Sequence, residues 1–180
     1  KGIITSVNFA KKMNIKNSVL VGADEAEMVK EFIKSNNIPV LLKDMHQLPN
    51  YSQSSVDEFY KLPALLTKEG IKVGISFSGG MNGNARNLAF LAGNTVAYGL
   101  SKEEALQLIT SNTAEILGIS ERVGTLEAGK DATLFISKGD ALDMRTNQLE
   151  KAWIQGKEVN LDDALQQRLY RKYKEKYNKK

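Results

Sequence analysis

The sequence predicts an α/β fold with a parallel sheet, because short apolar segments alternate with segments of helical periodicity. Three apolar segments rich in β-branched residues lie at positions 18–22, 39–42 and 71–77. Strands that are separated by helices pair in parallel, and a parallel sheet needs helices packed against it. With 180 residues, 42% of them hydrophobic, the chain can bury a sizeable core. A globular protein is therefore expected.

The helices of this unit are predicted from apolar residues that recur every three or four positions. They are expected at residues 3–13, 24–36, 56–70, 85–98 and 102–117. Ser101 and Glu104 have the spacing of a capping box, in which each residue hydrogen-bonds the backbone of the other. The last of these helices should therefore begin directly after Ser101.

From residue 123 onward the pattern changes from alternating strands and helices to strands and turns. Strands are expected at residues 124–126 and 132–136, and a β-hairpin at 151–159. The hairpin is predicted from the dipeptide Gln155-Gly156, which has the length of a two-residue turn between strands. A second structural unit thus follows the α/β unit.

A basic helix is expected at the C-terminal end of the sequence. It can begin at Asp162 or Asp163, and Leu165, Leu169 and Tyr173 form an apolar stripe. The last thirteen residues contain seven basic and one acidic residue, although the formal net charge of the chain is only +4. Because the remainder is mildly acidic, we expect a solvated helix and no nucleic-acid partner. No apolar run approaches the roughly 20 residues that span a bilayer, so no membrane partner is expected.

The composition excludes several kinds of site. The chain contains no cysteine and one histidine, so disulfide scaffolds, thiol nucleophiles and thiolate metal sites are ruled out. A catalytic zinc takes about three protein ligands from His, Cys and carboxylates, and a multi-histidine site cannot be built here. No metal site is therefore predicted in this chain, and its cellular compartment stays open.

Several motifs follow the third predicted strand. They are Asn84-Ala85-Arg86-Asn87-Leu88, Gly99-Leu100-Ser101-Lys102-Glu103-Glu104-Ala105-Leu106, Thr110-Ser111-Asn112-Thr113-Ala114, Val123-Gly124-Thr125-Leu126-Glu127-Ala128-Gly129-Lys130-Asp131-Ala132 and Trp153-Ile154-Gln155-Gly156-Lys157. With them, the stretch from Asn84 to Val159 resembles the C-terminal part of the amidohydrolase superfamily, in particular the imidazolonepropionase-like metal-dependent hydrolases.

This resemblance implies the C-terminal portion of a (β/α)8 TIM-like barrel, with part of a small β-sandwich and a C-terminal helix. The implied domains are a partial barrel at residues 1–120, part of the sandwich at 121–160 and the basic helix at 161–180. Three strands fall short of the eight that a complete barrel contains. A partial barrel exposes two sheet edges, so we expect association with the missing N-terminal part, or an oligomer.

The resemblance also implies chemistry. Superfamily members use one or two metal ions, held largely by histidine and aspartate, to activate water for hydrolysis of an amide or cyclic amide C–N bond. At the corresponding positions this sequence has Val21, and Phe77 or Ser78, which depart from the ligand pattern. The isolated chain is thus expected not to be catalytically self-sufficient, and no catalytic residue is assigned. A divalent metal such as zinc, and a small amide-type substrate, are implied only for the complete protein.

Candidate substrate-binding residues follow the second and third predicted strands, because barrel sites form at the carboxyl ends of strands. They are Lys43, Asp44, His46, Ser78, Asn82, Asn84 and Arg86. His46 can equally be a surface or capping imidazole. Two other functions remain open: a non-catalytic assembly or binding domain with the same fold, and a small α/β domain that binds a phosphorylated ligand at Gly79-Gly80.

Overall fold

The computed structural model describes residues 2–43, 45–77 and 82–178. In this part of the chain, the first unit is a three-stranded parallel sheet in the order β1-β2-β3. The strands are β1 (Leu20–Val21), β2 (Val40–Leu42) and β3 (Val73–Ile75). Val40 is in register with Leu20 on one side and with Val73 on the other. The predicted α/β class and parallel pairing are confirmed.

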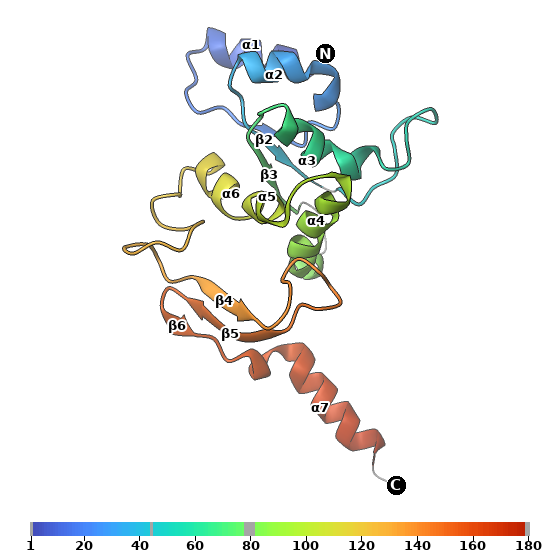
Figure 1. The fold of residues 1–180 in the computed structure, drawn as a ribbon, viewed down its shortest axis with the longest axis vertical. Helices are drawn as coiled ribbons and strands as arrows, with labels where there is room; N and C mark the ends of the chain where they lie inside the picture. Colours follow the sequence, from blue (N-terminus) through green and yellow to red (C-terminus); the bar gives the residue numbers. More distant parts are fainter. Residues whose placement is uncertain (1, 44, 78–81, 179–180) are drawn as a thin grey trace.

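Helices precede and connect these strands (Figure 1). They are α1 (Gly2–Lys12), the 3-10 helix η1 (Ala26–Val29), α2 (Lys30–Ser35) and α3 (Glu58–Lys68). The single helix expected at residues 24–36 is thus divided into η1 and α2. It ends at Asn36 and Asn37, and Asn37 has a φ of 50°, a left-handed conformation that interrupts a helix and that asparagine tolerates.

A second series of helices follows β3. It consists of η2 (Asn82–Asn87), α4 (Leu88–Asn94), η3 (Thr95–Tyr98), α5 (Lys102–Gln107) and α6 (Ser111–Ile116). The predicted capping box is confirmed: the Glu104 N–H donates to Ser101 Oγ over 3.2 Å, and the Ser101 N–H donates to Glu104 Oε2 over 2.7 Å.

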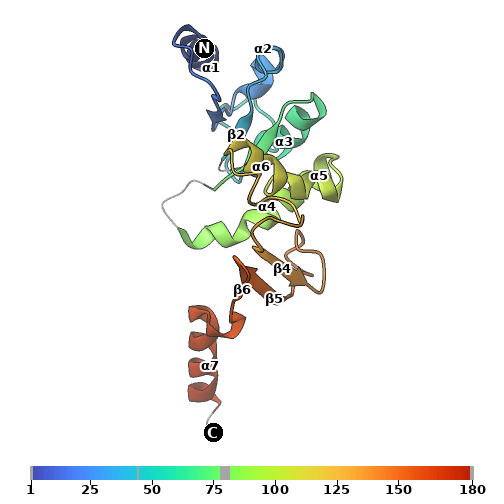
Figure 2. The ribbon, with the colours of Figure 1, turned by 90° about the vertical axis from the view of Figure 1, so that its left-hand side faces the viewer.

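Helices cover both faces of the parallel sheet (Figures 1 and 2). A Cβ atom on Gly74 would lie 2.6 Å from Thr113 Oγ1 and 3.1 Å from Ile116 Cδ1. Helix α6 therefore lies directly on the face that carries Gly74. Because side chains alternate along a strand, Val73 and Ile75 point to the opposite face. There they belong to a buried core that includes Ile33 of α2 and Leu62 and Leu66 of α3.

The two edges of this sheet differ. At the edge of β3, the Ile75 N–H donates to the Leu108 carbonyl over 2.9 Å, and Asn112 Nδ2 donates to the Val73 carbonyl over 3.1 Å. At the edge of β1, Val21 is 62% exposed, and no described strand pairs with it on that side. The expectation of two open edges is therefore wrong for β3, because the α5–α6 connection occupies its hydrogen-bonding groups.

A three-stranded antiparallel sheet follows, with the order β4-β5-β6. Its strands are β4 (Leu134–Ser137), β5 (Leu149–Ile154) and β6 (Lys157–Glu158). The predicted hairpin is confirmed, and its turn residues Gln155 and Gly156 both have positive φ angles, 51° and 78°, as a type I′ turn requires. The strand expected at residues 124–126 does not form. Gly124 has a φ of 101°, which is incompatible with an extended strand.

The chain continues through η4 (Leu161–Asp163) into α7 (Leu165–Tyr177). Helix α7 has no buried residue and extends away from the rest of the molecule (Figures 1 and 2). The basic C-terminal helix is thus present as predicted. Among the described helices, none has the length and apolar character needed to cross a membrane.

Candidate functional site

The carboxyl ends of β1 and β2 place a lysine where parallel α/β folds bind ligands. Lys43 directly follows β2 and is half-buried. Gly22, with a φ of 85°, turns the chain away from β1, and a Cβ atom there would lie 3.2 Å from Lys43 Cε. The lysine side chain therefore reaches across the end of β1, over a position that has no side chain to obstruct it.

Ser76 fixes the neighbouring end of β3. Its N–H and its hydroxyl both donate to the Leu42 carbonyl, over 2.8 and 3.2 Å. These bonds continue the β2–β3 pairing by one residue, to the point where Lys43 begins. The backbone that carries the lysine is thus held from both neighbouring strands.

Other predicted site residues stay predictions. Asn82, Asn84 and Arg86 belong to η2, and the Arg86 side chain is exposed to solvent. Asp44 and Ser78, as well as the Gly79-Gly80 pair, lie outside the described residues. Of the seven candidates, Lys43 is the one that the structure places at the carboxyl edge with a described environment.

His46 lies in a different environment. Its ring stacks on Tyr60 of α3 with 5.1 Å between the ring centroids, and its Nε2 is 2.8 Å from Asn94 Nδ2 in α4. An amide nitrogen donates, so Nε2 accepts this bond. The histidine therefore connects α3 to α4, a structural contact that differs from the surface or capping role considered from the sequence, and its role in substrate binding stays a prediction.

The same histidine borders a cleft of about 760 Å³. The cleft is lined by α4, by Lys102 at the start of α5 and by the segment 140–145 between β4 and β5. Lys43, Ser76 and Arg86 do not line it. The structure thus separates His46 from Lys43, although only two residues lie between them in the sequence.

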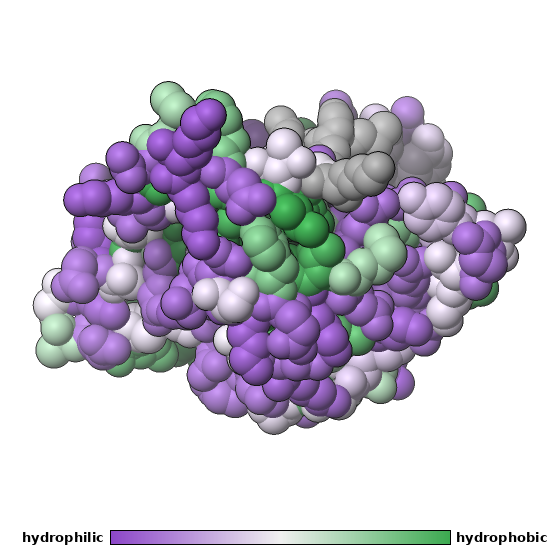
Figure 3. Space-filling model, turned by 90° about the horizontal axis from the view of Figure 1, so that it is seen from above, coloured by the Kyte–Doolittle hydropathy of each residue, from purple (hydrophilic) through white to green (hydrophobic). Residues whose placement is uncertain are grey.

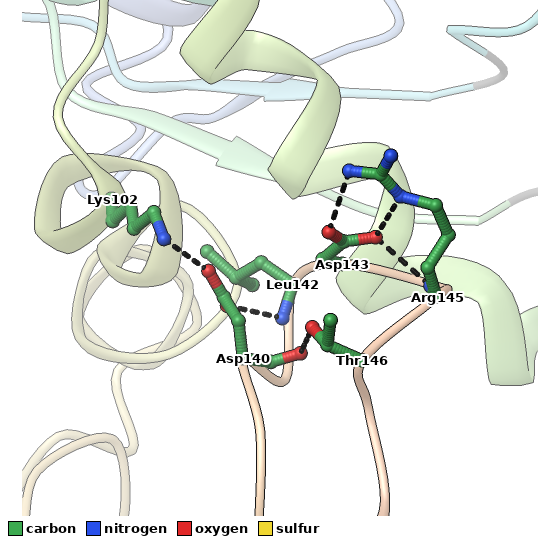
Figure 4. A network of polar contacts seen from close by, with 6 residues as sticks. All are labelled: Lys102, Asp140, Leu142, Asp143, Arg145 and Thr146. Atoms are coloured by element: carbon green, nitrogen blue, oxygen red, sulfur yellow. Dashed lines mark hydrogen bonds and ion pairs between the residues drawn. The ribbon is translucent and has the colours of Figure 1, made fainter.

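The loop of residues 140–145 forms the opposite wall of this cleft. Figure 4 shows the polar contacts of this loop. Asp140 Oδ2 pairs with Lys102 Nζ over 2.7 Å, and Asp140 Oδ1 accepts the Leu142 N–H over 2.9 Å. Asp143 accepts the Arg145 N–H over 2.9 Å and pairs with its guanidinium over 3.0 Å. The Lys102–Asp140 pair joins the loop to α5, whereas the other bonds lie within the loop. The 140–145 loop is called the acidic loop below.

These contacts shift the titration of both carboxyl groups. The hydrogen bond from Lys102, with that from the Leu142 N–H, lowers the pKa of Asp140. The hydrogen bond from the Arg145 side chain lowers the pKa of Asp143. Neither aspartate is among the candidate residues predicted from the sequence. Their signal is the Asx turn, in which an aspartate accepts the N–H two positions later, but the pairing with Lys102 depends on tertiary structure.

The described residues do not fit a catalytic metal centre. Lys43 and Ser76 contribute an ammonium and a hydroxyl to the carboxyl edge, whereas divalent metals in hydrolases take imidazole and carboxylate ligands. No group of three or more His, Asp or Glu side chains placed to hold a metal ion occurs among the residues with described positions. What Lys43 can do is bind an anionic or strongly polar group at the end of the sheet.

Comparison with known proteins places the chain in a family. The sequence model of the Amidohydrolase family matches residues 2–159. An amidohydrolase from Thermotoga maritima MSB8 has a similar structure, with a TM-score of 0.74 and 25% identity over 88% of this chain and 40% of its own. Comparison with curated protein sequences gave no match.

Two further solved structures share the fold. Molinate hydrolase gives a TM-score of 0.61 and 14% identity, over 89% of this chain and 41% of its own. A zinc-bound adenosine deaminase from Xanthomonas campestris gives 0.50 and 18%, over 83% of this chain and 40% of its own. The chain thus spans about 40% of the length of the Thermotoga relative. Because the family description matches most of its residues, the chain belongs to the amidohydrolase family.

Proposed function

We propose that this chain is the C-terminal portion of a metal-dependent amidohydrolase that hydrolyses the C–N bond of an amide or cyclic amide. The observation that carries the proposal is the family match over residues 2–159. In this proposal residues 1–120 belong to a (β/α)8 barrel, 121–160 to a small β-sandwich and 161–180 to an appended helix. The described residues contain no group of three or more His, Asp or Glu side chains that could hold a metal ion, so the proposal requires ligands from the rest of the complete enzyme.

The part of the barrel that this chain lacks is proposed to join first at the open edge of β1, and closure of the barrel at β3 would require the Leu108 and Asn112 contacts to be displaced. Exposed apolar side chains gather near that edge and on α1, namely Ile4, Phe9, Met13, Ile15 and Val21. Figure 3 shows apolar surface open to solvent at the end of the molecule that carries α1 and α2. Exposed apolar surface of this kind is typical of an interface.

Lys43 is proposed to bind the substrate. Its residue follows the carboxyl end of β2 and is half-buried, and its side-chain carbons pass beside Gly22. An ammonium there attracts a carboxylate or a polarised carbonyl of an amide-type substrate, and hydrogen bonds to charged groups contribute about 1.5–3 kcal/mol. The lysine would thus position the substrate without taking part in bond breaking.

The test compares this chain alone with the same chain joined to the preceding part of its polypeptide. Metal content is measured by elemental mass spectrometry, and hydrolysis with a panel of N-acyl amino acids and cyclic amides. We expect the joined protein to contain zinc or another divalent metal and to lose activity with a chelator. The Lys43→Met variant should lower kcat/KM roughly 10- to 100-fold. Lys34→Met, which removes an exposed lysine of α2, should not.

A second candidate is a non-catalytic assembly or binding domain. It is favoured by the observation that the described residues contain no group of three or more His, Asp or Glu side chains that could hold a metal ion. A joined protein that is metal-free, inactive towards the whole panel and a defined oligomer by light scattering would support it and contradict the hydrolase proposal. Binding of a phosphorylated ligand at Gly79-Gly80 stays a prediction, which thermal-shift titration with nucleotides and sugar phosphates tests.

A further inference from the structure

Helix α7 carries an apolar face that no other part of the described chain covers. Leu165, Leu169, Tyr173 and Tyr177 recur every four residues and therefore lie along one side of the helix, with Tyr170 beside them. Their side chains are between 41% and 72% exposed. The helix contacts η4 and extends away from β4, β5 and β6 (Figures 1 and 2), so the small sheet does not cover this face.

Positive charge surrounds the apolar face. Helix α7 contains five basic residues and one acidic residue, Glu175, whereas basic and acidic residues are balanced in the rest of the chain. The helical period places Lys172 and Lys176 along one border of the face and Lys174 along the other. Lys174 Nζ lies 5.7 Å from the centre of the Tyr170 ring, and Lys176 Nζ lies 5.4 Å from that of Tyr177. The cations thus stand directly at the margin of the apolar surface.

This combination selects among the surfaces that could cover α7. In a second copy of the chain, the same lysines would meet each other across the contact and repel. A nucleic acid would bind the cationic side and leave the apolar face in water. An anionic phospholipid surface satisfies both features, since apolar side chains enter the lipid interface while lysines reach the headgroup phosphates. Tyrosine is also enriched at the boundary between lipid and water.

We propose that α7 binds peripherally to anionic phospholipid membranes, with Leu165, Leu169 and Tyr173 in the lipid interface and the surrounding lysines and arginines on headgroup phosphates. This inference departs from the expectation of no membrane partner, which considered only spanning segments. It is independent of the proposed hydrolase function, because it uses no residue at the carboxyl edge of the parallel sheet.

The test measures co-sedimentation of the full chain with vesicles of phosphatidylcholine mixed with phosphatidylglycerol, and with vesicles of phosphatidylcholine alone. We expect binding to the mixed vesicles only, weakened by salt. The Leu165→Ser/Leu169→Ser variant should bind at least about tenfold more weakly. Removal of one margin charge by Lys172→Gln should weaken binding about fivefold. The matched control is Leu126→Ser, which removes an 82% exposed leucine outside α7 and should bind like the parent chain.

Circular dichroism of each variant shows whether the chain retains its helices, so that lost binding is not a folding defect. The proposal is overturned if the full chain does not sediment with the mixed vesicles. It is equally overturned if the double leucine variant binds the mixed vesicles unchanged and the full chain also binds a single-stranded RNA oligonucleotide. That result would indicate a site for polyanions in general. Light scattering that shows a dimer abolished by the leucine changes would assign α7 to self-association instead.

Discussion

The parallel sheet and the antiparallel sheet bury their apolar residues to very different extents. Ile75 in β3 is 1% exposed, whereas Ile136 in β4 is 47% exposed. The parallel sheet has helices on both faces, whereas the strands of the antiparallel sheet keep many exposed side chains, and Leu142 of the acidic loop is buried. An isolated small sheet gains little stability in water. The comparison shows that β-strand pairing can be encoded locally even where the paired strands keep half-exposed apolar side chains.

The largest effect is expected when equivalent isoleucines are shortened in the two sheets. Ile75→Ala should lower the free energy of unfolding by about 2–5 kcal/mol, because it leaves a cavity in a closed core. Ile136→Ala removes the same atoms from a half-exposed site, and surface changes are usually within about 0.5 kcal/mol. Urea denaturation measures both. Equal losses would show that β4 is covered in solution and would remove the contrast.

A second substitution addresses the contact between the two units. Gly93 in α4 approaches the acidic loop so closely that an added Cβ would lie 2.2 Å from the Leu142 carbonyl oxygen. Gly93→Ala should therefore destabilise the protein by about 1–3 kcal/mol and increase hydrogen exchange in residues 139–147. Gly2→Ala, at a position with no atom nearby, should not be destabilising. Unchanged exchange in Gly93→Ala would mean that the loop does not depend on α4.

The hairpin of the antiparallel sheet offers a test within that sheet alone. Gly156 has a φ of 78° and no atom within 4 Å of an added Cβ, so a substitution there acts through backbone conformation. Gly156→Val should cost about 1–2 kcal/mol, and Gly156→Asn clearly less, because asparagine tolerates the left-handed region. Thermal denaturation followed by circular dichroism compares the two variants. Equal losses would argue for a steric cause.

The smallest effect concerns pH. The pKa of Asp140 is lowered in the folded protein, chiefly by Lys102, so its contribution is complete above the unfolded value of about 4 and is lost as pH falls through the folded value. The pKa of Lys102 is raised, so its contribution persists until alkaline pH. Protection of the Leu142 amide, measured by NMR, should therefore decrease in acid. The decrease should be smaller in Lys102→Met, and identical profiles would contradict a role for this pair.

The sequence predicted features whose causes are local. The three parallel strands are continuous apolar runs, the Ser101–Glu104 box is a contact between neighbours, and the Gln155-Gly156 turn requires only two left-handed residues. The missing strand at 124–126 shows where this reasoning fails. Val123 and Leu126 have an apolar pattern, but the conformation of Gly124 decides against an extended segment.

The candidate site was less predictable for a physical reason. Lys43 and His46 are close in sequence, and a shared site was a natural hypothesis. Between them, Met45 is buried in the core, and the chain then turns His46 towards Tyr60 and Asn94. Both partners come from helices far along the sequence. A pattern in one segment does not contain such contacts, so the division of the candidates into two places required the structure.

The hydrogen bonds on β3 affect which edge of the parallel sheet can pair with a further strand. A strand that approached β3 would have to displace the Leu108 carbonyl and the Asn112 amide from groups they already satisfy. At β1, no described strand occupies the outer edge. A further strand can therefore pair with β1 more easily than with β3. That asymmetry would also limit extension of the parallel sheet in an assembly of copies, since each copy offers the β1 edge of this sheet for pairing and not the β3 edge.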